Sequence, residues 1–211
     1  MIHTHTFRGL GYRTTPGRLH PQYSIDCFDG DEANIREKYW LPNRRDVVLD
    51  VGASYGAYTL TALARGAHVA ALEPERSIYE DLWENIKLNC AYAGCAAWNY
   101  GLSDKEETID MREVAPHWPA HTITHPYQMR RLDDLPFVTL DWIKIDVEGM
   151  EEKVLRGGQE TIKRCRPKVL CECHSFIDKD MVEKCKSLLT GYTFEVLPPH
   201  HKDVYMMVAT P

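Results

Sequence analysis

DVVLDVGASYGAYTLTALARG, residues 46 to 66, joins an apolar run to a glycine-containing turn and a helical pattern. The run 46–54 predicts a buried strand, and 55–66 predicts a helix that ends at Gly66, because glycine is favoured just after a helix. The same order of strand and helix recurs along the chain. Strands that alternate with helices are typical of a parallel sheet covered on both faces, so we predict an α/β fold.

Further strands and helices continue this pattern. The predicted strands span 68–75, 95–104, 141–147, 168–175, 192–197 and 203–210. The predicted helices span 77–94, 150–165 and 178–191. The last two strands are separated by too few residues for a helical crossover. We therefore expect a mostly parallel, seven-stranded sheet that ends in an antiparallel C-terminal hairpin.

The bulk composition is that of an ordinary globular protein. The 211 residues are 44% hydrophobic and 27% charged, which suffices for one domain with a sizeable core. The 25 Lys and Arg against 31 Asp and Glu give a formal net charge of -6, which disfavours nucleic acid as a required partner. No apolar stretch reaches the roughly 18 residues of a membrane span, and no secretory signal is recognisable, so we expect a cytoplasmic protein. The 7 scattered cysteines indicate reduced thiols.

The chain divides into an extension and a main domain. Residues 1–45 form an N-terminal extension that we expect to pack on the core, with one helix in 31–40. Residues 46–211 form the main domain, in which prolines predict an irregular, substrate-side insertion at about 105–130. The histidines that recur every four residues there are His117, His121 and His125. The prolines between them argue against a helical metal-binding face.

Glycines and polar residues follow the first three predicted strands. The turn DVGASYG, residues 50–56, contains two glycines that let the backbone approach a ligand closely. Glu73 ends the second strand, where a carboxylate can accept hydrogen bonds from both hydroxyls of a ribose. Ser103 and Asp104 end the third strand, where they could hold a purine amino group. Because the carboxyl ends of such strands meet at one edge, they outline one nucleoside-shaped site.

A nucleoside cofactor without phosphates fits this pattern best. A dinucleotide site requires glycine in the middle of G-x-G-x-x-G, where this chain has Ser54, and Asp50 would place negative charge beside the phosphates. An acidic residue suits the ammonium and sulfonium groups of S-adenosylmethionine. The predicted cofactor site contains Asp50, Gly52, Ala53, Ser54, Tyr55, Gly56, Glu73, Pro74, Ser103, Asp104 and Asp146. The alternative, in which the glycines only make a tight turn, stays open.

Three segments together resemble the FkbM family of S-adenosylmethionine-dependent methyltransferases. They are residues 47–89, RLDDL at 131–135, and 141–174, which contains KIDVEG. The resemblance implies a class I methyltransferase fold, which is a Rossmann-like three-layer sandwich, and transfer to a hydroxyl oxygen of a sugar or natural product. It also implies that Asp50 and the two glycines of the 50–56 turn hold the methionine end of the cofactor. Glu73 would then hold the ribose, and Ser103 with Asp104 the adenine.

WIKIDVEGM, residues 142–150, places Lys144, Asp146 and Glu148 on alternate positions of an otherwise buried strand and its end. Charges in such a strand need a functional reason. Methyl transfer to oxygen requires that the hydroxyl proton be taken or that the oxygen be bound by a metal. Asp146 is our candidate for general base or metal ligand, and Lys144 would keep it ionised or act as the base itself. Glu148 serves either the acceptor side or only the helix that follows.

The next strand adds Glu172 and His174, which share one face by the period of two. With Lys144 and Asp146 they complete our set of catalytic candidates. Asp146, Glu172 and His174 could bind Mg²⁺ or Mn²⁺, and a metal-free hydrogen-bond network is the alternative. Cys171 on the opposite face is interpreted, like Cys173, as a small buried hydrophobe.

The function that we predict is methyl transfer from S-adenosylmethionine to a hydroxyl on a sugar, glycan or natural-product small molecule. The first alternative is a nucleic acid methyltransferase acting on a ribose 2′-hydroxyl, which would need a basic groove that the net charge disfavours. The second is a catalytically idle S-adenosylmethionine-binding module, which should have lost the polar residues at the strand ends.

Overall fold

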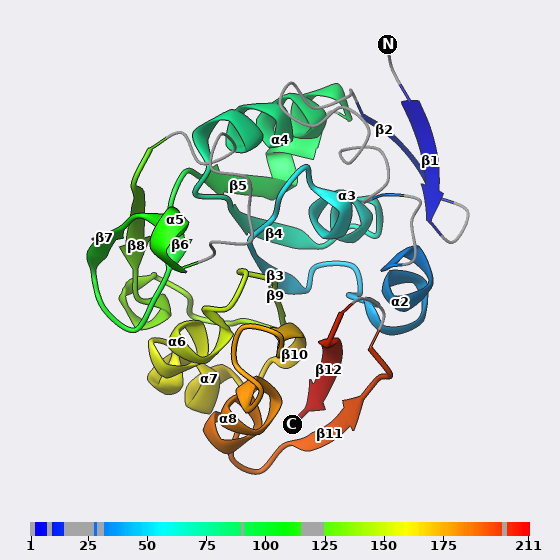
Figure 1. Cartoon of the computed structure of the whole chain (residues 1–211). Coiled ribbons are helices and arrows are strands. Elements are labelled where there is room, and N and C mark those ends of the chain that lie inside the picture. The colour runs from blue at the N-terminus through cyan, green and yellow to red at the C-terminus, as the bar shows by residue number, and fades with distance from the viewer. Residues whose placement is uncertain are drawn as a thin grey trace.

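A seven-stranded sheet with helices on both faces forms the centre of the protein (Figure 1). The computed structural model describes residues 3–7, 10–14, 28, 32–89, 91–114, 125–199 and 202–211. The sheet strands are β3 (Val47–Val51), β4 (His68–Leu72), β5 (Cys95–Trp98), β9 (Trp142–Ile145), β10 (Lys168–His174), β11 (Thr193–Val196) and β12 (Val204–Thr210). Their order is β11-β12-β10-β9-β3-β4-β5.

The strand directions confirm the predicted fold class. Neighbouring strands from β5 to β10 run parallel, whereas β12 runs antiparallel to both β10 and β11. The loop 197–203 between β11 and β12 is too short for a crossover helix, which needs about a dozen residues, so the chain turns back as a hairpin. The hairpin closes one edge of the sheet.

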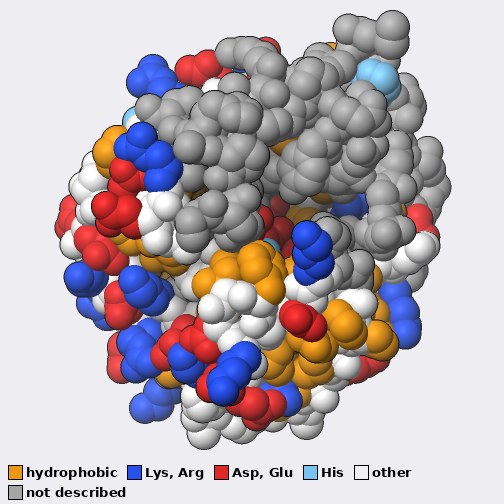
Figure 2. Space-filling model, in the orientation of Figure 1, with side chains coloured by type: hydrophobic (Ala, Val, Ile, Leu, Met, Phe, Trp, Pro, Cys, Tyr) orange, Lys and Arg blue, Asp and Glu red, His pale blue; other side chains and the backbone are white. Residues whose placement is uncertain are grey.

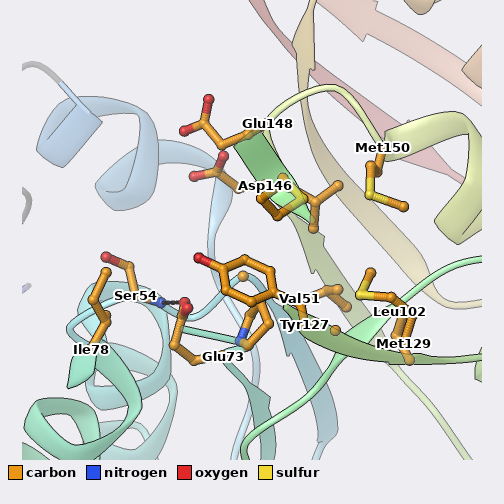
Figure 3. A pocket seen from close by; sticks show the side chains of 15 residues that line it. Val51, Ser54, Glu73, Ile78, Leu102, Tyr127, Met129, Asp146, Glu148 and Met150 are labelled. Atoms are coloured by element: carbon orange, nitrogen blue, oxygen red, sulfur yellow. Dashed lines mark hydrogen bonds between the residues drawn. The ribbon is translucent and has the colours of Figure 1, made fainter. Parts of the chain in front are cut away.

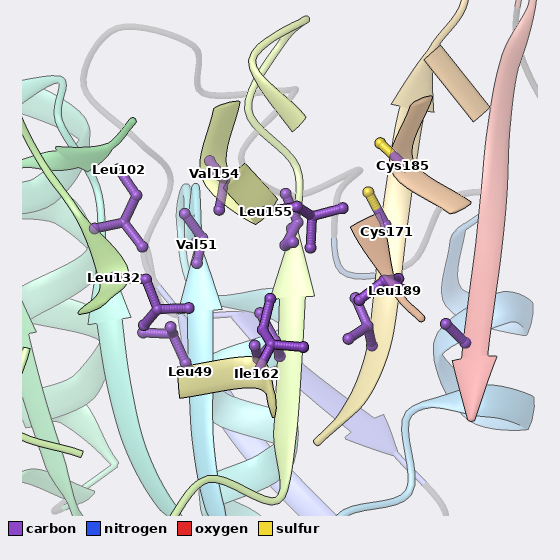
Figure 4. Close-up of a cluster of buried hydrophobic side chains, with 14 of the residues drawn as sticks. Leu49, Val51, Leu102, Leu132, Val154, Leu155, Ile162, Cys171, Cys185 and Leu189 are labelled. Carbon is purple, nitrogen blue, oxygen red and sulfur yellow. The ribbon is translucent and has the colours of Figure 1, made fainter. Parts of the chain in front are cut away.

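Two hydrophobic clusters cover the two faces of the sheet. The helices are α3 (Ala57–Ala64), α4 (Arg76–Leu88), α6 (Glu151–Arg156), α7 (Gln159–Cys165) and α8 (Met181–Leu188). Val48 packs with side chains of α3 and α4, whereas its neighbour Leu49 packs with side chains of α6, α7 and α8 (Figure 4). This alternation follows from the period of two in a strand, and it gives the three layers. Cys171 and Cys173 are fully buried in the second cluster together with Cys185.

The N-terminal region contributes a hairpin and a helix. β1 (His3–Phe7) pairs antiparallel with β2 (Leu10–Thr14), and α2 (Glu32–Tyr39) falls where the sequence predicts a helix. Trp40, which follows α2, is fully buried, and its ring lies edge-on to those of Tyr58 and Trp142 at centroid distances of 5.5 and 5.4 Å. Among the described residues, no helix is long and apolar enough to cross a membrane.

A second, three-stranded sheet lies beside the edge of the main sheet that is formed by β5. Its strands are β6 (Gly101–Leu102), β7 (Glu107–Ile109) and β8 (Tyr127–Arg130), in the order β6-β8-β7. The predicted strand 95–104 is therefore two strands in different sheets. The segment 105–130, predicted to be irregular, contains β7, β8 and the short helix α5 (Met111–Val114). The prolines responsible for that prediction precede β8 and do not interrupt it, and Pro116 and Pro119 lie outside the described residues.

Two predicted helices are also broken in the structure. The range 77–94 divides into α4 and the 3₁₀ turn η1 (Ala91–Gly94), and the side chain of Asn89 caps the end of α4 by donating to the carbonyl of Asn85 at 2.7 Å. The range 150–165 divides into α6 and α7 at Gly157, where an added Cβ would lie only 2.1 Å from the carbonyl oxygen of Ser103. A second 3₁₀ turn, η3 (Leu132–Asp134), leads from β8 toward β9.

Candidate active site

The carboxyl ends of β3 and β9 meet at the point where the strand order reverses. From β3 the chain proceeds outward through β4 and β5, whereas β9 and β10 lie on the other side, so a crevice is expected between β3 and β9. Gly52, just after β3, has a φ of +77°, and a Cβ added there would lie 1.8 Å from the carbonyl oxygen of Asp146. Only glycine fits this contact, which joins the turn 50–56 to the end of β9.

A pocket opens at this edge and encloses about 750 Å³, part of which is open to solvent (Figure 3). Figure 3 shows Ser54 and Glu73 at one end of the pocket and Asp146 with Glu148 at the other. The pocket therefore has two polar ends, with Tyr127 and mostly apolar side chains between them.

Five of the residues predicted for cofactor binding line this pocket, and the others do not. The lining residues among them are Gly52, Ser54, Glu73, Pro74 and Asp146. Those outside the lining are Asp50, Ala53, Tyr55, Gly56, Ser103 and Asp104. At the end of the third predicted strand, Gly101 and Leu102 line the pocket in place of Ser103, whose hydroxyl donates to Glu107 at 2.7 Å.

Asp50 begins the turn 50–56, and its side chain points into the protein. Its carboxylate is buried and accepts a hydrogen bond from the hydroxyl of Thr59 at 2.6 Å. Burial raises the pKa of Asp50 to about 6, against the opposing effects of the Thr59 hydrogen bond and the charge of Lys144. Asp50 thus ties the end of β3 to helix α3 rather than facing the pocket.

Glu73 is held in the pocket wall by two main-chain hydrogen bonds. Its Oε2 accepts from the amide of Ser54 at 3.0 Å, and its Oε1 accepts from the amide of Glu75 at 2.9 Å. Each carboxylate oxygen has a second lone pair left for a ligand hydroxyl. Burial raises the pKa of Glu73 to about 8, although both hydrogen bonds favour the ionised form.

A cluster of three methionines and one tyrosine forms a wall of the pocket, and sequence reasoning missed the methionines. Its members are Met111, Tyr127, Met129 and Met150. The hydroxyl of Tyr127 donates to Glu75 Oε2 at 3.2 Å, which fixes the ring within the pocket. The sequence offered little to find the methionines, because they come from three separate elements: α5, β8 and the start of α6. His125 lies beside Tyr127, whereas His117 and His121 are outside the described residues.

Lys144 is enclosed within the protein below the polar end of the pocket. Its side chain is 1% exposed, and its Nζ lies 3.3 Å from Asp146 Oδ2 and 3.8 Å from Glu172 Oε2. The same Nζ stands over the ring of Tyr58, 4.6 Å from its centroid. Burial would raise the pKa of Asp146, but the charges of Lys144 and His174 outweigh it and hold that pKa below its usual value. Lys144 therefore keeps Asp146 ionised.

His174 is surrounded by three carboxylates. Its Nδ1 lies 2.7 Å from Glu151 Oε1, and its Nε2 lies 3.3 Å from Glu148 Oε2 and 3.9 Å from Asp146 Oδ1. Burial lowers the pKa of His174, but Glu151 and the other two carboxylates raise it to about 10. Sequence reasoning did not single out Glu151, because an acidic residue in the first helical turn is ordinary.

The structure brings Asp146 and His174, two of the three predicted metal ligands, together with Glu148. Oxygen and nitrogen atoms of Asp146, Glu148 and His174 lie within 4.8 Å of one another, whereas Glu172, predicted as the third ligand, faces Lys144. Glu148 does not cap the following helix: the N-cap of α6 is Met150, without a side-chain hydrogen bond. Glu148 instead adopts a φ of +55° and reaches His174. The helix role considered for Glu148 is therefore not seen.

Solved structures of methyltransferases share this fold at low sequence identity. Methyltransferase FkbM from Methylobacillus flagellatus KT matches with a TM-score of 0.60 and 20% identity over 78% of this chain and 43% of that one. Precorrin-6y C5,15-methyltransferase from Geobacter metallireducens GS-15 matches with a TM-score of 0.54 and 17% sequence identity, over 93% of this chain and 92% of that one. TYW2 of M. jannaschii, solved in complex with AdoMet, matches with a TM-score of 0.53 and 14% sequence identity, over 99% of this chain and 84% of that one. These likenesses show the fold, and the present chain spans less than half of the Methylobacillus protein.

The sequence itself matches a family model. The model of the methyltransferase FkbM domain covers residues 50–206, which is most of the chain. No curated protein matches the sequence. The matched range begins at Asp50 and extends into β12, so it contains the pocket and all the charged residues around His174. The chain belongs to the FkbM family of S-adenosylmethionine-dependent methyltransferases.

Proposed function

We propose that this protein transfers the methyl group of S-adenosylmethionine to a hydroxyl oxygen of a sugar, glycan or other small natural product. The observation that carries the proposal is the polar end of the pocket, where Asp146 and Glu148 are 28% and 26% exposed. Both carboxylates line the pocket, at the end opposite Glu73. A hydroxyl acceptor must lose its proton during methyl transfer, and these groups are placed to take it.

The opposite end of the pocket fits the nucleoside part of the cofactor. Glu73 has lone pairs available for the two ribose hydroxyls, and the tight turn at Gly52 and Ser54 leaves room for the methionine part. Ile78 and Leu102 offer apolar surface for an adenine ring. In this arrangement the sulfonium methyl points toward Asp146.

The proposed reaction is an in-line displacement. A lone pair of the acceptor oxygen forms the new bond to the methyl carbon while the carbon–sulfur bond breaks and its electrons return to sulfur. The hydroxyl proton passes to Asp146, which Lys144 keeps ionised, and then to solvent. The products are the methyl ether and neutral S-adenosylhomocysteine.

The surroundings of Asp146 favour a small acceptor without phosphates. Asp146 and Glu148 would repel a polyphosphate chain, and the formal net charge of the protein is -6. Phe176, which is 41% exposed, has its ring 5.8 Å from that of His174 and offers an apolar face to a sugar ring. Figure 2 shows a hollow with acidic, hydrophobic and basic side chains at its edge.

Three measurements test the proposal. Calorimetry should show that S-adenosylhomocysteine binds to the protein, whereas NAD does not. With a panel of sugars, glycans and RNA, labelled methyl groups should appear on a sugar or glycan hydroxyl. The Asp146→Asn variant should lower kcat by about 10²–10⁴-fold, because the proton acceptor is lost. The exposed Asp134→Asn is the matched control. Full activity of Asp146→Asn, or methylation of RNA alone, would contradict the proposal.

A further inference from the structure

We propose that Asp146, Glu148 and His174 bind one divalent cation, Mg²⁺ or Mn²⁺, at the acceptor end of the pocket. The inference deepens the proposed function and rests on it for the role of the ion, but not for its binding. The ligand set differs from the one expected from the sequence, because Glu148 takes the place of Glu172.

The distances between the ligand atoms suit one ion. His174 Nε2 lies 3.3 Å from Glu148 Oε2 and 3.9 Å from Asp146 Oδ1, and the three ligand atoms lie within 4.8 Å of one another. Two ligands at about 2.1 Å from an octahedral ion are about 3.0 Å apart at right angles and about 4.2 Å apart when opposite. Small side-chain rotations would therefore place all three around the same centre.

The orientation of His174 is fixed by a residue outside the ligand set. The imidazole is 5% exposed, and the fully buried Glu151 lies 2.7 Å from its Nδ1. Its Nε2 faces Glu148 Oε2 and Asp146 Oδ1, which are the other two members of the ligand set. Histidines that ligate metals commonly donate their other ring N–H to a carboxylate, as Glu151 allows here.

The carboxylates around the site favour a positive charge at His174, which is a proton on the ring in the unliganded protein and would be the divalent ion once Nε2 has released that proton. Asp146, Glu148 and Glu151 all approach a single imidazole, and Lys144 reaches Asp146 only from the buried side. The two carboxylates are ligands that suit Mg²⁺ or Mn²⁺, and the imidazole nitrogen is accepted more readily by Mn²⁺, a transition metal, than by Mg²⁺. Because Asp146 and Glu148 line the pocket, the ion would keep positions open toward the acceptor, whose bound hydroxyl would lose its proton more readily.

The backbone directs Glu148 into this arrangement. Its φ of +55° is followed by a φ of +100° at Gly149, a pair of left-handed residues between β9 and α6. Left-handed residues other than glycine are uncommon and tend to occur at functional sites. The turn gives Glu148 its contact with His174, while the amide of Gly149 donates to Glu151 at 3.0 Å.

Titration of chelator-treated protein with Mn²⁺ alone, followed by electron paramagnetic resonance, tests the site without cofactor or acceptor. We expect one bound Mn²⁺ per chain. His174→Gln and the partly exposed Glu148→Gln should each weaken binding at least tenfold, and Glu151→Gln should weaken it about 10–100-fold as an orienting partner. The control is Glu183→Gln, at an acid that is 74% exposed and lies outside the site, which should bind Mn²⁺ unchanged. Circular dichroism checks that each variant is folded.

The outcomes separate this inference from the proposed function. Absence of saturable Mn²⁺ binding would overturn the cation site, and methyl transfer at full rate by the metal-stripped protein would then leave the proposed function standing. Mn²⁺ binding that survives both His174→Gln and Glu148→Gln would also overturn the assignment. Mn²⁺ binding that these variants remove, without methyl transfer to any hydroxyl acceptor, would support the cation site and contradict the proposed function.

Discussion

Glu73 illustrates how burial sets the charge of a ligand-binding carboxylate. Its pKa is raised to about 8, mainly by burial, from an ordinary value of 4.5. At neutral pH the unliganded protein therefore keeps a proton on Glu73 that the unfolded chain would release. The folded state binds more protons than the unfolded state between these two pKa values, so this group's contribution to stability falls as the pH rises through that range.

The affinity for S-adenosylhomocysteine should depend on pH through Glu73. If the ribose hydroxyls donate to the ionised carboxylate, binding must release the proton, so affinity should rise by up to about tenfold per pH unit from pH 6 and level off near pH 8. Calorimetry in buffers of different ionisation enthalpy would measure the released proton. Glu73→Gln should bind more weakly with a flatter profile. A pH-independent affinity in the unmodified protein would refute the ionised state.

At the scale of elements, Gly157 allows two segments distant in sequence to touch. It separates α6 from α7, and its missing side chain lets the carbonyl of Ser103, just after β6, approach the main chain. Glycine costs about 1 kcal/mol in a helix interior relative to alanine. The successive glycines 157 and 158 therefore make a continuous helix less stable, but they do not exclude it. The sequence pattern alone could not detect this contact.

Gly157→Ala should destabilise the protein by about 1–3 kcal/mol, because the new Cβ would meet the Ser103 carbonyl and force the two segments apart. Urea unfolding followed by fluorescence measures the change. Gly94→Ala is the matched control, because the nearest atom to its Cβ would be a leucine methyl at the ordinary distance of 3.4 Å. Equal effects of both substitutions would show that the tight contact does not matter.

The alternation of strands and helices predicted the parallel sheet well, because β3, β4, β9 and β10 are largely apolar runs. The same reasoning predicted Glu73 and Asp146 as strand-end residues, and both line the pocket. The same reasoning could not predict which strand-end side chains point away from the pocket. Asp50 binds Thr59, and Glu148 reaches His174 only because its φ is positive. Such details depend on turn conformations and on contacts between distant segments.

At the scale of the whole molecule, the N-terminal region shares the main hydrophobic core. Trp40 is fully buried between Tyr58 of α3 and Trp142 of β9, and its indole N–H donates to the carbonyl of Tyr58 at 3.0 Å. The face of the Tyr58 ring also contacts the ammonium group of Lys144. The residues before β3 therefore support the strand that bears Asp146.

Trp40→Ala should lower the free energy of unfolding by about 3–5 kcal/mol, because it leaves a large cavity and removes the indole hydrogen bond to the carbonyl of Tyr58. Chemical denaturation would measure the loss, and the affinity for S-adenosylhomocysteine under native conditions would show whether β9 has shifted. Trp98→Ala is the control, since that side chain is 40% exposed and should cost much less. A similar loss for both variants would argue against a specific role of Trp40 in the core.

In the proposed reaction, the close approach of Gly52 to the Asp146 carbonyl would set the alignment of the two reactants through the main chain. The turn after β3 and the end of β9 cannot move independently without breaking this contact. We therefore expect that changes to exposed side chains such as Phe176 would alter which acceptor is chosen without lengthening the path of the methyl group. On this proposal, substrate choice and transfer geometry would be separable, and the acceptor range could be redesigned while the central strands stay fixed.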